Sequence, residues 1–173
     1  MRPEIRPTAV ERFFGEEEII VSKTDLKGVI TYANPVFLKI AGYTEDETLG
    51  QSHNLVRHPD MPRCIFRLLW DTIAGGREIF AYVKNMAKNG DYYWVHAHVT
   101  PTFDAAGRII GYHSNRRVPE RAAVASVDAL YAQLLAEERR HSDWRQGMEA
   151  SEQMLGGVLQ RAGVEYDEFV FSL

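Results

Sequence analysis

The chain has 173 residues, with 20 basic against 24 acidic side chains and a net charge of −4. This length predicts one domain, or one domain with an appendage. Because 45% of the residues are hydrophobic and 25% are charged, a disordered chain is excluded, and the slight negative charge predicts no nucleic-acid partner. No segment approaches the roughly 20 apolar residues that cross a bilayer, so we expect no membrane insertion.

The number of cysteines and the N-terminal residues indicate in which cellular compartment the protein is expected. Cys64 is the single cysteine and has no partner for an intramolecular disulfide. The basic residues near the N-terminus are not followed by an apolar run, so they do not predict a signal peptide. We therefore expect a protein of the reducing cytoplasm.

The first elements in chain order are a leader and a hairpin. Residues 1–17 contain two early prolines and predict a loose or extended leader. Residues 19–21 and 29–32 are apolar or β-branched and flank the turn residues Asp25 to Gly28. This pattern predicts a β-hairpin at the start of the domain.

Two short helices are expected after the hairpin. Asn34 is placed to cap a helix with Pro35 at its first position, and Gly42 is placed to end it. Residues 44–47 have the capping-box pattern and predict one further helical turn. Residues 53–62 are polar and bounded by proline, and predict a loop without regular structure.

The second half of the domain predicts one helix and three strands. Residues 64–74 carry apolar side chains on one helical face. Strands are expected at 79–85, 92–100 and 108–117, the first two joined by a turn at Asn89-Gly90. Residues 18–118 therefore predict an α+β domain, a five-stranded antiparallel sheet with short helices on one face.

The remaining residues, 119–173, predict a C-terminal helical extension. Residues 124–140 have apolar side chains at helical spacing. A second helix is expected up to Gly163, with an interruption at Gly147, and the apolar tail at 169–171 is expected to dock. We expect this extension to pack on the sheet or on a second copy of the chain, which makes a homodimer the expected assembly.

Two sets of residues resemble the PAS domain family. Residues 31–37 and 41–51 resemble the opening half of PAS domains, and residues 84–101 resemble the closing half. Residues 53–62, His-Asn-Leu-Val-Arg-His-Pro-Asp-Met-Pro, are similar to the loop of the flavin-binding PAS domain of bacterial aerotaxis receptors. The resemblance covers about residues 19–117 and implies the PAS fold.

This resemblance also implies a cofactor, FAD with FMN as the alternative, and a function in sensing redox state or oxygen. The positions that match the family's motifs, or that offer a flat ring beside them, are Asn34, Arg57, His58, Asp60, Trp70, Asn85 and Tyr93. Arg57 is suited to a phosphate, and the Asn85 amide is suited to the polar edge of a flavin. Trp70 and Tyr93 offer flat surfaces. An unknown downstream protein would receive the signal.

The light-sensing PAS domains are a useful contrast. Aligned on Leu49-Gly50, the position of their adduct-forming cysteine is occupied here by His53, and Cys64 lies later, on a predicted helix. We therefore expect no cysteinyl adduct, and redox state rather than light as the input.

The sequence is also compatible with other functions. A PAS adaptor without cofactor would dimerise through its C-terminal helices, and a haem-binding PAS gas sensor would use a histidine. His96 and His98 share one face of a strand and would need His53 or His113 to complete a metal site, which we do not expect. No nucleophile elbow or phosphate-binding loop is present, so the sequence does not predict an enzyme.

Overall fold

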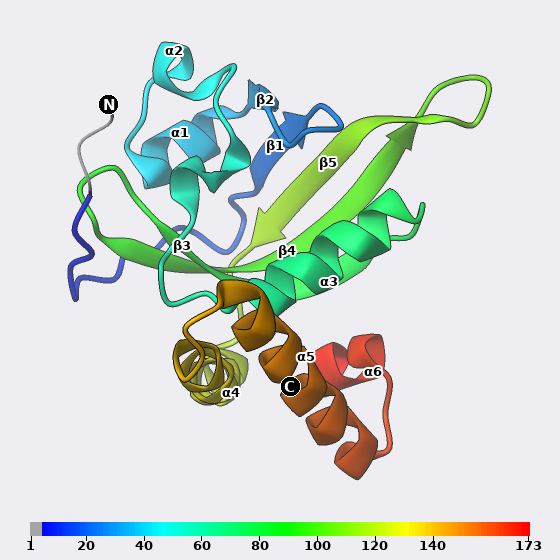
Figure 1. Cartoon of the computed structure of the whole chain (residues 1–173). Coiled ribbons are helices and arrows are strands. Elements are labelled where there is room, and N and C mark those ends of the chain that lie inside the picture. The colour runs from blue at the N-terminus through cyan, green and yellow to red at the C-terminus, as the bar shows by residue number, and fades with distance from the viewer. Residues whose placement is uncertain (1–4) are drawn as a thin grey trace.

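A five-stranded antiparallel sheet with the strand order β2-β1-β5-β4-β3 organises the computed structural model, which describes residues 5–173 (Figure 1). The strands are β1 Ile20–Thr24, β2 Ile30–Ala33, β3 Ile79–Met86, β4 Tyr92–Phe103 and β5 Ile109–Arg117. The predicted hairpin of β1 and β2 is confirmed, as is the α+β class.

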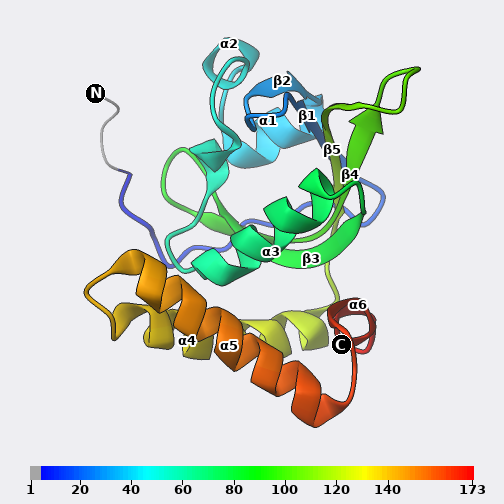
Figure 2. The same cartoon turned by 45° about the vertical axis from the view of Figure 1, so that its right-hand side comes forward.

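The short helices lie together on one face of this sheet (Figures 1 and 2). They are α1 Pro35–Ala41, α2 Glu45–Thr48, the 3-10 turn η1 His53–Val56 and α3 Arg63–Ala74. The expectation of an irregular loop at 53–62 is wrong for its first four residues. Ser52 Oγ accepts the backbone N–H of Asn54 at 3.3 Å and so caps a 3-10 turn there.

Local capping places the first two helices as the sequence predicts. Asn34 Oδ1 accepts the N–H of Phe37 at 3.0 Å, and Gly42 ends α1 in the left-handed conformation with φ 74°. Thr44 and Glu47 form the reciprocal capping box of α2. These caps hold α1 and α2 against β1 and β2, beside the region where the cavity forms.

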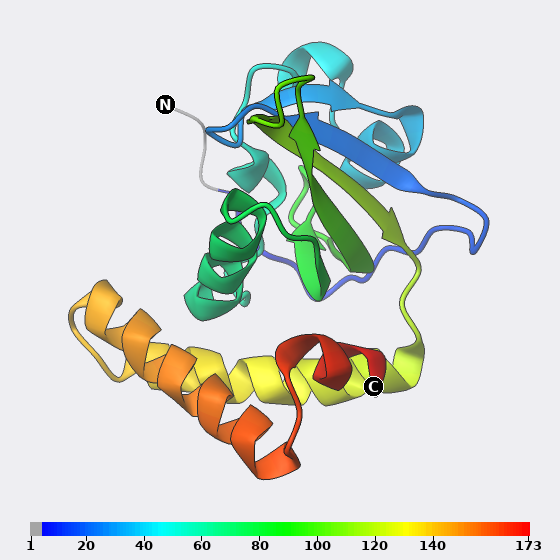
Figure 3. The same cartoon turned by 90° about the vertical axis from the view of Figure 1, so that its right-hand side faces the viewer.

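The C-terminal extension packs on the opposite face of the sheet from the short helices (Figure 3). It consists of α4 Arg121–Arg139, α5 Trp144–Ala162 and α6 Tyr166–Phe171. The Tyr131 hydroxyl of α4 donates to the backbone oxygen of Tyr82 on β3 at 2.7 Å. The Phe171 ring lies 4.8 Å from that of Phe80. Packing on the sheet and docking of the tail are therefore confirmed.

The α4 helix also reaches the start of α3. Glu138 is 7% exposed, and its Oε1 atom accepts the backbone N–H of Cys64 at 3.1 Å and the Ser151 hydroxyl at 2.9 Å. Pro62 precedes α3 and offers no side-chain cap of its own. One carboxylate from α4 therefore satisfies an N–H group at the start of α3 and binds α5 at the same time.

The expected interruption at Gly147 is wrong, because α5 runs through this residue and through Gly156 and Gly157. A Cβ atom at Gly147 would lie 2.5 Å from the backbone oxygen of Glu138. Glycine at this position permits the close approach of α4 and α5. The packing of α4 against α5 therefore outweighs the low helix propensity of glycine at this position.

The leader is extended and hydrogen-bonded over its described part. Arg12 N–H donates to the Tyr92 oxygen at 2.7 Å, and Tyr92 N–H donates to the Val10 oxygen at 3.0 Å. The leader therefore pairs beside the start of β4. The first of its two prolines, Pro3, lies outside the described residues. Across residues 5–173, no helix is long and apolar enough to cross a membrane.

The contact at Gly147 yields a stability prediction. Gly147→Ala lowers the free energy of unfolding by roughly 1 to 3 kcal/mol, because the added methyl group forces α4 and α5 apart. Gly156→Ala, in the same helix, is the control. A Cβ atom there meets no atom within 4 Å, so higher helix propensity stabilises the chain by about 0.5 to 1 kcal/mol. Urea unfolding measures both, and equal effects of the two substitutions would contradict the packing argument.

Candidate functional site

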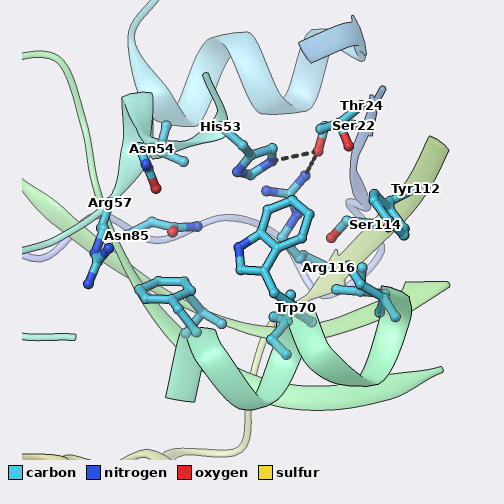
Figure 4. Close-up of a pocket in the computed structure, with 17 residues that line it drawn as sticks. Ser22, Thr24, His53, Asn54, Arg57, Trp70, Asn85, Tyr112, Ser114 and Arg116 are labelled. Atoms are coloured by element: carbon cyan, nitrogen blue, oxygen red, sulfur yellow. Dashed lines mark hydrogen bonds between the residues drawn. The ribbon is translucent and has the colours of Figure 1, made fainter. Parts of the chain in front are cut away.

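A cavity of about 90 Å³ lies between α3 and the inner face of the sheet (Figure 4). Its side chains fall into two groups. The apolar and aromatic members are Val56, Phe66, Leu69, Trp70, Ile73, Val83, Ala97, Val99 and Tyr112. The polar members are Ser22, Thr24, His53, Asn54, Arg57, Asn85, Ser114 and Arg116. The cavity is therefore a slot with apolar walls and a polar side.

A hydrogen-bonded chain of three residues from β5, β1 and η1 borders the slot (Figure 4). Arg116 donates through Nη2 to the hydroxyl oxygen of Ser22. The same hydroxyl lies 2.9 Å from His53 Nε2. Because Ser22 accepts from Arg116, its own proton is free to be donated to an unprotonated Nε2 of His53.

The Arg116 guanidinium is a buried positive charge that pairs with no acidic side chain among the described residues. Its residue is 2% exposed, and no carboxylate oxygen of residues 5–173 lies within 4 Å of it. Its Nε atom has no hydrogen-bond acceptor there, and its guanidinium carbon lies 5.3 Å from the centre of the Phe37 ring. Burial lowers the pKa of Arg116 to about 10, so the group is still charged at neutral pH.

His53 is the neutral member of this chain of residues. Burial, and then the positive charge of Arg116, lower the pKa of His53 to about 3. The imidazole is therefore uncharged at neutral pH. The arrangement leaves one positive charge at the polar side of the slot, where an electron-rich group would be stabilised.

Trp70 extends from α3 across the slot and closes it on the side of the β1–β2 turn. Its ring meets that of Tyr112 edge-on at 5.5 Å. A Cβ atom at Gly28, where φ is 77°, would lie 2.9 Å from the indole. Trp70 is also 37% exposed, so it separates the slot from solvent.

Three of the residues expected at a cofactor, Asn85, Arg57 and Trp70, line the slot. Asn85 is 4% exposed and lies on the inner face of β3. Arg57 lies at the other end of the slot from Tyr112, with its guanidinium carbon 4.5 Å from the centre of the Phe66 ring (Figure 4). The backbones of the two residues form an isolated bridge, which holds the loop after η1 against β3.

The other four residues expected at a cofactor lie outside the lining. Asn34 caps α1, and its Nδ2 donates to the Ile19 oxygen at 2.7 Å. Tyr93 is fully buried, opposite Asn85 in the β3–β4 register. His58 is 2% exposed and accepts the Asp60 N–H at 3.0 Å, while the Asp60 carboxylate pairs with Lys84 at 3.1 Å. The structure thus places His58 and Asp60 where they shape the loop that carries Arg57.

Sequence reasoning missed most polar residues of the slot. Tyr112, Ser114 and Arg116 alternate along β5 and so share its inner face. That alternation was a usable signal, but a charged residue near a strand end ordinarily indicates exposure. For His53 the sequence suggests only a metal ligand or the counterpart of a photosensor cysteine.

The remaining candidate groups lie elsewhere. His96 and His98 are on the outer face, where their rings stack on Tyr82 at 4.6 Å and on Phe80 at 4.1 Å. In the described part of the chain, no three His, Cys, Asp or Glu side chains are placed to hold a metal ion. Cys64 is buried in α3 and does not line the slot.

Sequence comparison gives the family to which this fold and its slot between helix and sheet belong. Residues 30–116 match the PAS fold family, so the chain belongs to it. It is 43% identical to the aerotaxis receptor of Escherichia coli K12 over 121 residues, which are 70% of this chain and 24% of the receptor. It is 29% identical to the nitrogen fixation regulatory protein of Klebsiella pneumoniae over 102 residues, 59% of this chain and 21% of that protein.

The structural comparison agrees on the fold. The light-state structure of the blue-light photoreceptor Aureochrome1 LOV superposes with a TM-score of 0.56 at 22% identity, over 70% of this chain and 91% of that one. The PAS fold expected from the sequence is therefore confirmed. The chain spans about a quarter of the length of the aerotaxis receptor that it matches.

The neutral His53 yields a pH prediction. Its pKa of about 3 in the folded chain lies below the ordinary value of 6.5, so protons bind the unfolded chain more tightly. Its contribution to stability is complete above pH 6.5 and is lost as the pH falls toward 3, by at most about 1.4 kcal/mol per pH unit.

Urea unfolding between pH 4 and 7.5 measures this contribution as the difference between the wild type and His53→Gln. We expect the difference to fall with decreasing pH. Gln51→Ala, two residues away, removes no titrating group, so its difference from the wild type stays constant. A constant difference for His53→Gln as well would show that His53 is not held neutral.

Proposed function

We propose that this chain is a flavin-binding PAS sensor of redox state or oxygen, with FAD as its cofactor and FMN as the alternative. The observation that carries the proposal is the charge of Arg116, buried beside an apolar slot with no carboxylate of residues 5–173 within 4 Å. A flavin ring is flat and apolar with one polar edge, and it gains electrons on reduction. A fixed positive charge favours that reduced form.

The side chains of the slot offer the polar and flat groups that such a ring needs. Asn85 offers an amide donor and an acceptor for ring carbonyl and N–H groups. Arg57, at the far end of the slot, suits a phosphate. The space of about 90 Å³ is smaller than three fused rings, and the side chain that closes it is Trp70. We therefore expect Trp70 to turn toward solvent when the cofactor enters.

The proposed output runs through α3. This helix carries Phe66, Leu69 and Trp70 to the slot, and Glu138 of α4 binds its first turn. A change in hydrogen bonding or charge at the cofactor would shift α3, and Glu138 would pass the shift to α4 and α5. This requires two arrangements of α3 whose energies depend on the redox state.

The comparisons support the sensory class. The similarity to an aerotaxis receptor favours oxygen or redox state as the input, and the chain spans only part of that receptor. We infer a cytoplasmic, non-enzymatic protein that acts as a homodimer or on a separate signalling partner. With His53 in the slot and Cys64 outside it, cysteinyl-adduct photochemistry is not part of this proposal.

The function is tested by an absorbance spectrum of the purified chain, recorded with and without added FAD and before and after anaerobic reduction. We expect the bands of oxidised flavin, which bleach on reduction. A Soret band would indicate haem instead. A spectrum that stays featureless after addition of FAD would leave a PAS adaptor without cofactor.

The role of Arg116 gives a sharper prediction. Arg116→Gln removes the positive charge at the ring and lowers the midpoint potential of the flavin by roughly 30 to 60 mV for a two-electron couple. Arg117→Gln is the matched control, because this neighbour is exposed on the other face of β5. Spectroelectrochemical titration measures both variants. Equal potentials would mean that Arg116 does not face the ring.

A further inference from the structure

A second cavity, of about 470 Å³, lies between the loop after η1 and the turn that joins α4 to α5. Arg57 and Met61 line it on the side of the loop, and Arg139 and Trp144 line it on the side of the turn. Arg57 also lines the first cavity, so the two cavities meet at this side chain. Figure 2 shows the α4–α5 turn beside the start of α3.

The second cavity gathers positive charge. Arg57, Arg63 and Arg139 contribute three guanidinium groups to it. Within residues 5–173, neither Arg57 nor Arg63 has a carboxylate oxygen within 4 Å, and Arg139 has one at 3.9 Å, from Asp60. Glu138 is the acidic residue of the lining, and its Oε1 already accepts from Cys64 and Ser151.

Guanidinium groups that line one cavity repel one another, and a bound anion relieves that repulsion. Burial, and then the charge of Arg63, lower the pKa of Arg57, while the charge of Glu138 opposes this shift. Guanidinium groups bind phosphate oxygens in pairs with good geometry. The cluster therefore suits a ligand with more than one phosphate charge.

Trp144 adds a surface for an aromatic base. It is the first residue of α5 and is 48% exposed. The guanidinium carbon of Arg63 lies 5.6 Å from its ring centre, on the edge of the charged cluster. An indole beside a phosphate site matches the layout of a nucleotide, in which a flat purine follows the phosphates.

We propose that the second cavity binds the diphosphate and adenine of a dinucleotide flavin whose ring occupies the first cavity, with Arg57 at the junction. The inference rests on the proposed function. It assigns the choice of FAD over FMN to Arg139 and Trp144, two residues of the C-terminal extension. The extension is then part of the binding site as well as the output.

The test compares the affinities of the full chain for FAD, FMN and ADP by isothermal titration calorimetry. We expect FAD to bind at least about tenfold more tightly than FMN, and ADP to compete with FAD. Arg139→Gln and Trp144→Ala each weaken FAD binding by about tenfold and leave FMN binding unchanged. Arg140→Gln is the matched control, because Arg140 pairs with Glu137 at 2.9 Å and does not line the cavity.

Circular dichroism of each variant verifies that the fold is retained. If FAD and FMN bind equally and both variants behave as the wild type does, the inference is overturned and the flavin sensor stands. If neither flavin binds, both proposals fall together. ADP that binds without displacing FAD would also overturn the inference, since the cavity would then be a separate nucleotide site.

Discussion

Arg116 is 2% exposed, and in the described part of the chain no carboxylate lies within 4 Å of its guanidinium, so the surrounding residues accommodate its charge. Ser22 accepts a hydrogen bond from it, and the Phe37 ring lies 5.3 Å away. His53 is kept neutral in its presence. Removing a charge from water is costly unless other groups compensate. The polar side of the slot therefore depends on how this one charge is compensated.

Helix α3 links the slot to the C-terminal helices. Helix α3 begins after Pro62, which offers no side-chain cap, and Glu138 of α4 supplies the missing acceptor. The same helix carries Trp70 across the slot. The residues of α3 that line the cavity and the first turn of α3, which contacts the extension, thus belong to one helix. A movement at one end of this helix is transmitted to the other.

Most of the fold was predictable because its signals are local. The capping box at Thr44 and the caps at Asn34 and Gly42 act within a few residues, so their meaning does not depend on distant packing. The interruption expected at Gly147 was wrong for the opposite reason. Its glycine serves a contact with Glu138 on a different helix, and no short-range pattern reveals such a contact.

The sequence by itself determined the α+β class and the order of the elements, and its motif resemblance made Arg57, Trp70 and Asn85 candidates for a cofactor site. Only the tertiary structure decided which polar side chains face the slot. It separated Arg116 from its exposed neighbour Arg117, and it placed the turn before Trp144 beside Arg57. Burial of a charge and contact between distant helices depend on how the layers pack, and residue order alone does not encode them as a visible pattern.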